Sequence, residues 1–193
     1  MVKKKIETGD KKNTQQSNLK LLVFSALFAA LTAAIAPFKI PLGFTPVPIT
    51  LQTLAVLMSG AMLGPYYGAL AMILYVVVGA LGLPVFAGGG SGIGAVLGPT
   101  GGYLISYFIA AFVIGKVVQM RKEPKYVDYV VAMVAGTLII YLLGASWAMV
   151  VLPELTLTAV LAGWVFPFII GDTIKLLIAA YIANTVKLKQ YLR

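Results

Sequence analysis

Apolar runs close to the length of a bilayer crossing recur along this chain, and they constrain its fold more than any other feature. A helix needs about 20 mostly apolar residues to cross the hydrocarbon core of a membrane. Hydrophobic residues make up 60% of the 193 positions and charged residues only 11%, which is unlike the composition of soluble domains. We therefore expect an all-α, polytopic membrane protein built as a bundle of six transmembrane helices.

The expected crossings are separated by short breaks rich in proline, glycine or charge. They cover residues 19–36, 49–63, 65–83, 103–120, 126–152 and 158–186. Residues 1–18 are polar and charged and lack periodicity, and we expect them to form a disordered or frayed cytoplasmic tail. Residues 19–193 then form a single membrane domain. Pro167 is expected to kink the last crossing.

The basic residues indicate how the chain is oriented. The formal net charge is +9, and most of the 15 basic residues lie before the first crossing, between residues 116 and 125, or in the C-terminal tail. Cytoplasmic loops of membrane proteins carry an excess of Lys and Arg. This pattern predicts that both termini lie in the cytoplasm and that the protein lies in the cell membrane. It does not indicate a nucleic-acid partner.

One pair of charges lies deep inside an apolar segment. Asp172 and Lys175 are three residues apart, so on a helix they share a face and can touch. A single charge at the centre of a bilayer costs roughly 2.5–3.5 kcal/mol on insertion scales. The pair therefore either neutralises itself to pin the last helix to its neighbours, or faces the bundle interior as a polar ligand or ion site.

Two residue types that are frequent in active sites, Cys and His, are missing from the chain. There is no Cys and no His, which removes thiolate chemistry, the commonest general base and the commonest transition-metal ligand. Gly115-Lys116 is followed by Val117, so it does not form a phosphate-binding loop. We expect no catalytic residues, no metal site, no cofactor and no ATP site in this chain. A membrane enzyme is the least favoured function.

Residues 82–102 form an unusual loop with nine glycines and several apolar side chains. An apolar loop beside lipid must satisfy its backbone by folding into the protein or over a cavity. It is either a lid over the outward mouth of a site or a structural plug. The residues that we expect to form the lid are Phe86, Gly88, Gly89, Gly92 and Gly94.

Small residues follow one face of the first crossing. Ala26, Ala30 and Ala34 are spaced by four, so they align along one side of a helix. Small side chains let a second helix approach closely. The face is either a partner surface or a site of internal packing.

Together these features suggest a binder of a small polar solute that has no energy source of its own. A partner that supplies energy is then the better inference. The alternative is a stand-alone channel or facilitator for another small polar solute.

Four segments carry a resemblance to a known family. They are Thr45-Pro-Val-Pro-Ile-Thr-Leu-Gln52, Gly82-Leu-Pro-Val-Phe-Ala-Gly-Gly-Gly90, Leu97-Gly-Pro-Thr-Gly-Gly-Tyr103 and Asp172-Thr-Ile-Lys175. Over residues 19–186 the chain resembles the BioY family, the biotin-binding S components of energy-coupling-factor (ECF) vitamin importers. The resemblance implies high-affinity capture of biotin from outside. A membrane coupling (T) subunit and two cytoplasmic ATPase subunits would then power the import.

The resemblance also implies roles for particular residues. Asp172, Lys175 and the glycine-rich loop would line the biotin site, and the face of Ala26, Ala30 and Ala34 would contact the coupling subunit. A carboxylate such as Asp172 can accept hydrogen bonds from the ureido N–H groups of biotin. Lys175 can donate to the ureido oxygen or pair with the carboxylate of biotin. The ligand-binding residues expected in full are Asp172, Lys175, Gly90, Ser91, Tyr103 and Gln52.

Overall fold

The structure is a computed structural model that describes residues 2–186, with side chains described from residue 15 onward. Its helices are α1 (Val2–Ile35), α2 (Gln52–Leu63), α3 (Pro65–Ala80), α4 (Ile93–Leu97), α5 (Gly101–Gln119), α6 (Tyr126–Val151), α7 (Leu157–Val160) and α8 (Ile169–Val186). Two short strands, β1 (Lys39–Ile40) and β2 (Ile49–Thr50), pair antiparallel. The chain is therefore mostly helical, as expected.

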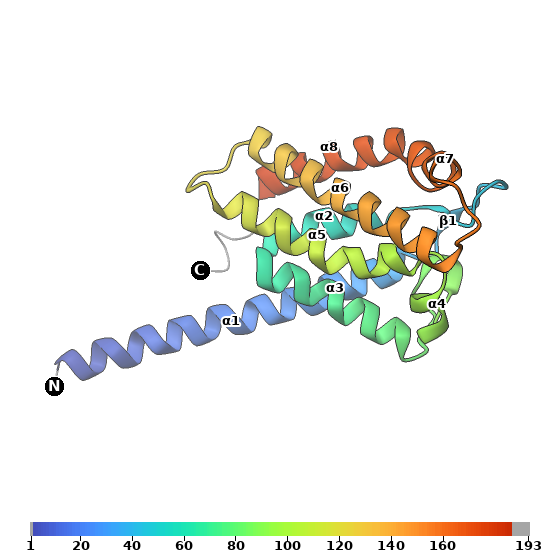
Figure 1. The fold of residues 1–193 in the computed structure, drawn as a ribbon. Helices are drawn as coiled ribbons and strands as arrows, with labels where there is room; N and C mark the ends of the chain where they lie inside the picture. Colours follow the sequence, from blue (N-terminus) through green and yellow to red (C-terminus); the bar gives the residue numbers. More distant parts are fainter. Residues whose placement is uncertain (1, 187–193) are drawn as a thin grey trace.

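The longer helices form a bundle, and α1 lies along one edge of it (Figure 1). The N-terminal half of α1 projects beyond the other helices (Figure 1). Helix α2 lies inside the bundle, because most of its residues are buried and it contacts α1, α3, α5 and α8. Helix α5 packs against α2, α3 and α6. This interior position of α2 is what brings its polar residues to the centre of the protein.

Glycines allow α2 to approach its neighbours closely. A methyl group on Gly60 of α2 would overlap the backbone of Ala111 in α5, and one on Gly68 of α3 would overlap the backbone of Gly60. Interfaces between membrane helices are enriched in such small residues, since close packing replaces the hydrophobic driving force there. The three helices α2, α3 and α5 form a tight core beneath the site.

The two ends of the bundle differ. One end carries the segments 36–51, 81–100 and 152–156, and we call it the loop end; it lies on the right in Figure 1. The opposite end, which we call the basic end, carries the break at Gly64 and the segment 120–125 with Arg121, Lys122 and Lys125. Helix α1 begins and helix α8 ends on the side of the basic end (Figure 1).

The protein is a multi-pass integral membrane protein of the cell membrane. Four helical segments are long and apolar enough to cross a membrane, namely residues 15–35, 101–119, 126–151 and 157–186. Helices α2 and α3 are also apolar but shorter, with 12 and 16 residues. Large apolar side chains remain exposed on the sides of the bundle, as a lipid-facing surface requires, among them Leu27, Val131, Leu142 and Ile170.

The N-terminal segment differs from our expectation. We predicted a disordered or frayed tail over residues 1–18, but α1 is helical from Val2, so the prediction of disorder is wrong for residues 2–18. A helix that is already nucleated by a long apolar segment extends at little cost through residues of good helix propensity, and Lys, Gln and Glu make up eight of the 17 residues 2–18. The basic residues of the C-terminal tail, Lys187, Lys189 and Arg193, lie outside the described residues.

The last crossing is interrupted, as Pro167 predicts. A π turn spans Leu161–Val165 and a 3-10 turn spans Phe166–Phe168 before α8 starts at Ile169. Proline has no N–H and its ring clashes with the preceding turn, so it cannot continue a regular helix. The interruption places Asp172 in the first turn of α8. The positive end of a helix dipole stabilises a carboxylate at that position.

Candidate ligand-binding site

Asp172 and Lys175 form a buried ion pair on α8. Nζ of Lys175 lies 2.5 Å from Oδ1 of Asp172, and the side chains are only 12% and 7% exposed, respectively. The predicted proximity of the two charges is therefore confirmed. Breaking a buried pair by removing one partner is strongly destabilising, because it leaves an uncompensated charge.

The ammonium group of Lys175 is fully engaged. Besides the carboxylate of Asp172, it donates to the backbone oxygen of Thr50 over 2.8 Å and to Oγ1 of Thr53 over 3.0 Å. A lysine ammonium has three N–H donors, and each has a partner here. Lys175 thus holds the start of α2 against α8 and has no donor left for another group.

The carboxylate of Asp172 has further partners. Oδ1 also accepts a hydrogen bond from the hydroxyl of Thr53 over 3.0 Å, and Oδ2 accepts one from the hydroxyl of Tyr141 in α6 over 2.7 Å. An ionised carboxylate offers about four acceptor positions. Two contacts occupy Oδ1 and one occupies Oδ2, so Oδ2 retains the capacity to accept one more hydrogen bond.

Gln52, the first residue of α2, contributes a second polar centre. Its Oε1 accepts a hydrogen bond of 2.8 Å from the hydroxyl of Tyr107 in α5. Within the described residues its Nε2 has no hydrogen-bond partner, although the residue is only 3% exposed. A buried donor without a partner costs about 1–3 kcal/mol. Such a donor inside a binding pocket is ready to meet a ligand oxygen.

These polar groups line one pocket. Asp172, Lys175, Gln52 and Thr53 lie in its wall together with Tyr107 and Tyr141, and the empty volume is about 470 Å³, open solvent included. Apolar side chains complete the wall, namely Val47, Pro48, Ala87, Ile140 and Phe168. Small-molecule sites combine mostly apolar walls with a few placed polar groups.

Tyr103 also lines this pocket, from the first turn of α5. It is 9% exposed, and its hydroxyl donates to the backbone oxygen of Trp164 in the π turn. The ring is held against Gly144 of α6, where any side chain would overlap it. Because its hydroxyl is engaged, Tyr103 offers the pocket an aromatic wall.

The glycine-rich loop is anchored at both ends and at one point between them. Phe86 is 4% exposed and packs edge to face on Tyr75, with ring centroids 5.6 Å apart. Farther along, Nε1 of Trp147 in α6 donates to the backbone oxygen of Gly98 over 2.9 Å. Between these anchors, Gly88, Gly89, Ser91 and Gly94 are exposed, while Gly92 donates to the backbone oxygen of Gly79 over 2.7 Å.

The expected site residues are only partly brought together. Asp172, Lys175, Gln52 and Tyr103 line the pocket, whereas Gly90 and Ser91 are not among its lining residues. Ala87 is the part of the glycine-rich loop that reaches the wall.

Sequence reasoning missed Thr50, Thr53, Tyr107 and Tyr141 as site residues. Thr53 and Tyr141 are polar groups within apolar segments, and this signal was available in the sequence.

The small-residue face of α1 lies away from the pocket. Ala26, Ala30 and Ala34 are all exposed, whereas Ser25 and Thr32 are buried on the opposite side of the helix. The hydroxyl of Ser25 donates to the backbone oxygen of Tyr67 in α3 over 2.9 Å. Internal packing within the described chain therefore uses the other face of α1 and leaves the alanines uncovered.

Comparisons with known proteins agree on one family. Residues 10–191 match the model of the BioY family. The chain is 41% identical over 169 residues to a protein of Thermotoga maritima named biotin transporter BioY, covering 88% of this chain and 96% of that protein. It is 31% identical over 179 residues to a protein of the same name from Lactococcus lactis subsp. cremoris, covering 90% and 94%.

A solved structure also matches over most of its length. It is the crystal structure of the S-component for biotin from an ECF-type ABC transporter. The TM-score is 0.81 at 30% sequence identity, and the match covers 91% of this chain and 97% of that one.

Proposed function

This chain belongs to the BioY family, and we propose that it is the biotin-binding subunit of an ECF-type vitamin importer. It captures biotin from outside the cell with high affinity and delivers it with energy from partner subunits. The observation that carries the proposal is the pocket itself. A carboxylate acceptor on Asp172 and an unpartnered amide donor on Gln52 line the same mostly apolar cavity.

The polar groups match the chemistry of the ureido ring of biotin. That group has two N–H donors and one carbonyl oxygen. Oδ2 of Asp172 accepts from an N–H, which is a charge-assisted hydrogen bond and stronger than a neutral one. Nε2 of Gln52 donates to the carbonyl oxygen. The sulfur-containing ring then packs on the apolar wall and on Tyr103.

Lys175 supports the site indirectly in this proposal. Its three donors already have partners, so Lys175 holds the carboxylate of Asp172 in place rather than contacting biotin. Such groups determine the geometry of the residues that touch the ligand. Gly90 and Ser91 lie outside the pocket wall, and they contact biotin only if the loop between Phe86 and Gly98 closes further.

We propose that the glycine-rich loop acts as a lid. Its anchors at Phe86, Gly92 and Gly98 restrict movement to the residues between them, which include the exposed residues Gly88, Gly89 and Gly94. Glycine permits backbone conformations that other residues resist, so this segment can adapt to a ligand at low cost.

The proposed topology has six crossings with both termini in the cytoplasm. Helices α2 and α3 are short for a bilayer, but α2 is shielded by its neighbours and need not match the lipid thickness. The basic segment 120–125 and the start of α1 lie at the basic end, which becomes the cytoplasmic side by the positive-inside rule. The loop end, with the pocket, then faces outward.

The proposed partners are a membrane coupling subunit and two cytoplasmic ATPases. The uncovered strip of Ala26, Ala30 and Ala34 on α1 provides a smooth surface for a helix of the coupling subunit. The chain itself needs no cofactor in this scheme, because ATP acts only through the partner subunits. A stand-alone facilitator would not co-purify with ATPases.

The proposal is tested by purifying the protein without added vitamin and identifying released small molecules by mass spectrometry. Biotin in stoichiometric amounts is the expected result. Titration of ligand-free protein with biotin and with other small vitamins then measures selectivity. Absence of biotin from the released fraction, together with no heat of binding on titration with biotin, would contradict the proposed function.

A further inference from the structure

Lys39 lies opposite a residue of the pocket wall. Strand β1 pairs with β2 so that Lys39 faces Thr50 across the ribbon. Directly opposed residues of an antiparallel pair point their side chains to the same face, with Cβ atoms roughly 4.5–5.5 Å apart. Thr50 lines the pocket, so the pairing places Lys39 directly beside the pocket wall.

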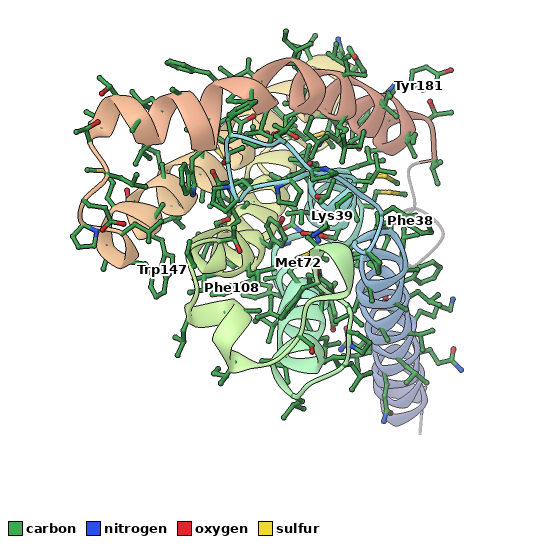
Figure 2. All side chains as sticks on the ribbon, turned by 90° about the vertical axis from the view of Figure 1, so that its right-hand side faces the viewer. Phe38, Lys39, Met72, Phe108, Trp147 and Tyr181 are labelled. Carbon is green, nitrogen blue, oxygen red and sulfur yellow. The ribbon has the colours of Figure 1, made fainter. Side chains whose placement is uncertain are left out.

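The side chain of Lys39 then crosses the glycine-rich loop. A methyl group on Gly88 would overlap Cδ, Cε and Nζ of Lys39, which means that the lysine lies directly on the bare backbone of Gly88. The neighbouring Ala87 belongs to the pocket wall. Viewed from the loop end, Lys39 lies near the middle of the molecule, whereas the adjacent Phe38 lies towards its edge (Figure 2).

The charge of Lys39 is available to a ligand. Among residues 15–186, no hydrogen bond or ion pair involves its ammonium group, and the residue is exposed. Lys175, the other cation near the pocket, has all three donors engaged. The remaining cations with described side chains are Lys20 on α1 and the residues between 116 and 125 at the basic end.

We propose that Lys39 recognises the carboxylate of the ligand at the rim of the pocket. The inference deepens the proposed function and rests on it. Biotin carries its carboxylate at the end of a flexible chain, away from the ureido ring. With the ring at Asp172 and Gln52, the chain runs towards the rim at Ala87, where Lys39 crosses the loop. The site thus has separate polar centres for the two ends of the ligand.

The test compares two ligands that differ only in charge. Full-length protein in detergent is titrated with biotin and with biotin methyl ester, using the wild type and Lys39→Met. The wild type is expected to bind biotin more tightly than the ester. Lys39→Met is expected to lose about tenfold or more in affinity for biotin and to retain its affinity for the ester, because only the charged ligand loses a charge-assisted contact. Lys39→Arg should restore part of the loss.

A matched pair of glycine variants tests the placement of the side chain. Gly88 and Gly89 both have positive φ, of 68° and 79°, so Gly88→Ala and Gly89→Ala strain the same turn. Only the methyl group at residue 88 meets Lys39; the one at residue 89 has nothing within 4 Å. Gly88→Ala should therefore lower the affinity for biotin more than Gly89→Ala does. This difference between the two variants should vanish when Lys39 has already been replaced by methionine. Lys20→Met serves as a control for a general loss of charge.

The outcomes separate the inference from the proposed function. If the wild type binds neither ligand, the proposed function fails and this assignment fails with it. If the wild type binds biotin and the ester equally, the function stands and the carboxylate role of Lys39 is wrong. A loss of affinity for both ligands in Lys39→Met would likewise overturn the assignment, since it would show that the lysine only supports the loop.

Discussion

The hydroxyl of Tyr141 donates to Oδ2 of Asp172 over 2.7 Å, and it joins the middle of the bundle to the first turn of α8. This bond aims the carboxylate at the pocket. Tyr141→Phe removes the donor and keeps the ring. We expect biotin affinity to fall by about 1.5 kcal/mol, or roughly tenfold, because hydrogen bonds to charged groups contribute about 1.5–3 kcal/mol. Titration calorimetry measures the change. An unaltered affinity would show that the orientation of Asp172 does not depend on Tyr141.

Asp172 is expected to contact the ligand through a charge-assisted bond. Asp172→Asn should weaken biotin binding by about 1.5–3 kcal/mol, ten- to a hundred-fold. Asp128→Asn is a matched control, because Asp128 pairs with Arg121 at the basic end, far from the pocket. If Asp172→Asn bound biotin with the affinity of the wild type, Asp172 would not be a ligand-binding residue.

The ion pair predicts coupling between its two members. Asp172→Asn leaves the buried ammonium of Lys175 without its counter-charge, and Lys175→Met leaves the carboxylate without its cation. Residues in direct contact give non-additive effects, whereas distant sites add. The decrease in unfolding temperature of the double variant should therefore be smaller than the sum of the decreases caused by the two single substitutions. Additive shifts in a thermal unfolding assay would contradict a mutual stabilisation.

The lid proposal predicts ligand-dependent protection. Hydrogen exchange over residues 86–98 should slow when biotin is added, because closure removes the loop amides from solvent. The segment 120–125 at the opposite end provides an internal reference that should not change. Equal exchange of residues 86–98 with and without biotin would favour a structural plug.

The strip on α1 predicts a separation of binding from transport. Ala30→Trp, alone or with Ala26→Trp, should leave biotin binding by the purified subunit near the wild-type value. The same variants should lose co-purification with the coupling subunit and lose uptake in cells, because a bulky side chain holds a partner helix away.

A control on another helix makes this test specific. Val131→Trp places the same bulk on α6, where the residue is 57% exposed on the side of the bundle. If the α1 variants bind biotin poorly and still co-purify, the strip is internal packing and the partner assignment is wrong.

Part of the site could be predicted from residue types and spacing. The contact between Asp172 and Lys175 follows from helical periodicity alone, since residues three apart share a face. The kink before α8 follows from the chemistry of Pro167. The N-terminal segment was predicted wrongly, because polarity was taken to indicate disorder although helix propensity favours extension of α1.

The contacts of the glycine-rich loop could be predicted only in part from its composition. Its composition indicated a segment folded against the protein, but not which residue reaches the pocket. Gly90 and Ser91 were expected there, and Ala87 lines the wall instead. Phe86 precedes Ala87 directly and is buried against Tyr75, a contact that the composition of the loop does not reveal.

The membrane class, the helical architecture and the contact between Asp172 and Lys175 follow from the sequence alone, because each depends on composition or on spacing within a single helix. The residues that surround this pair are set by how the helices pack in three dimensions. Thr53 and Thr50 meet the pair across 119 and 125 residues of sequence, and Tyr141 across 31. The packing of the helices determines these partners. That packing depends on contacts between all of the helices, so it cannot be read from the residue pattern of any single segment.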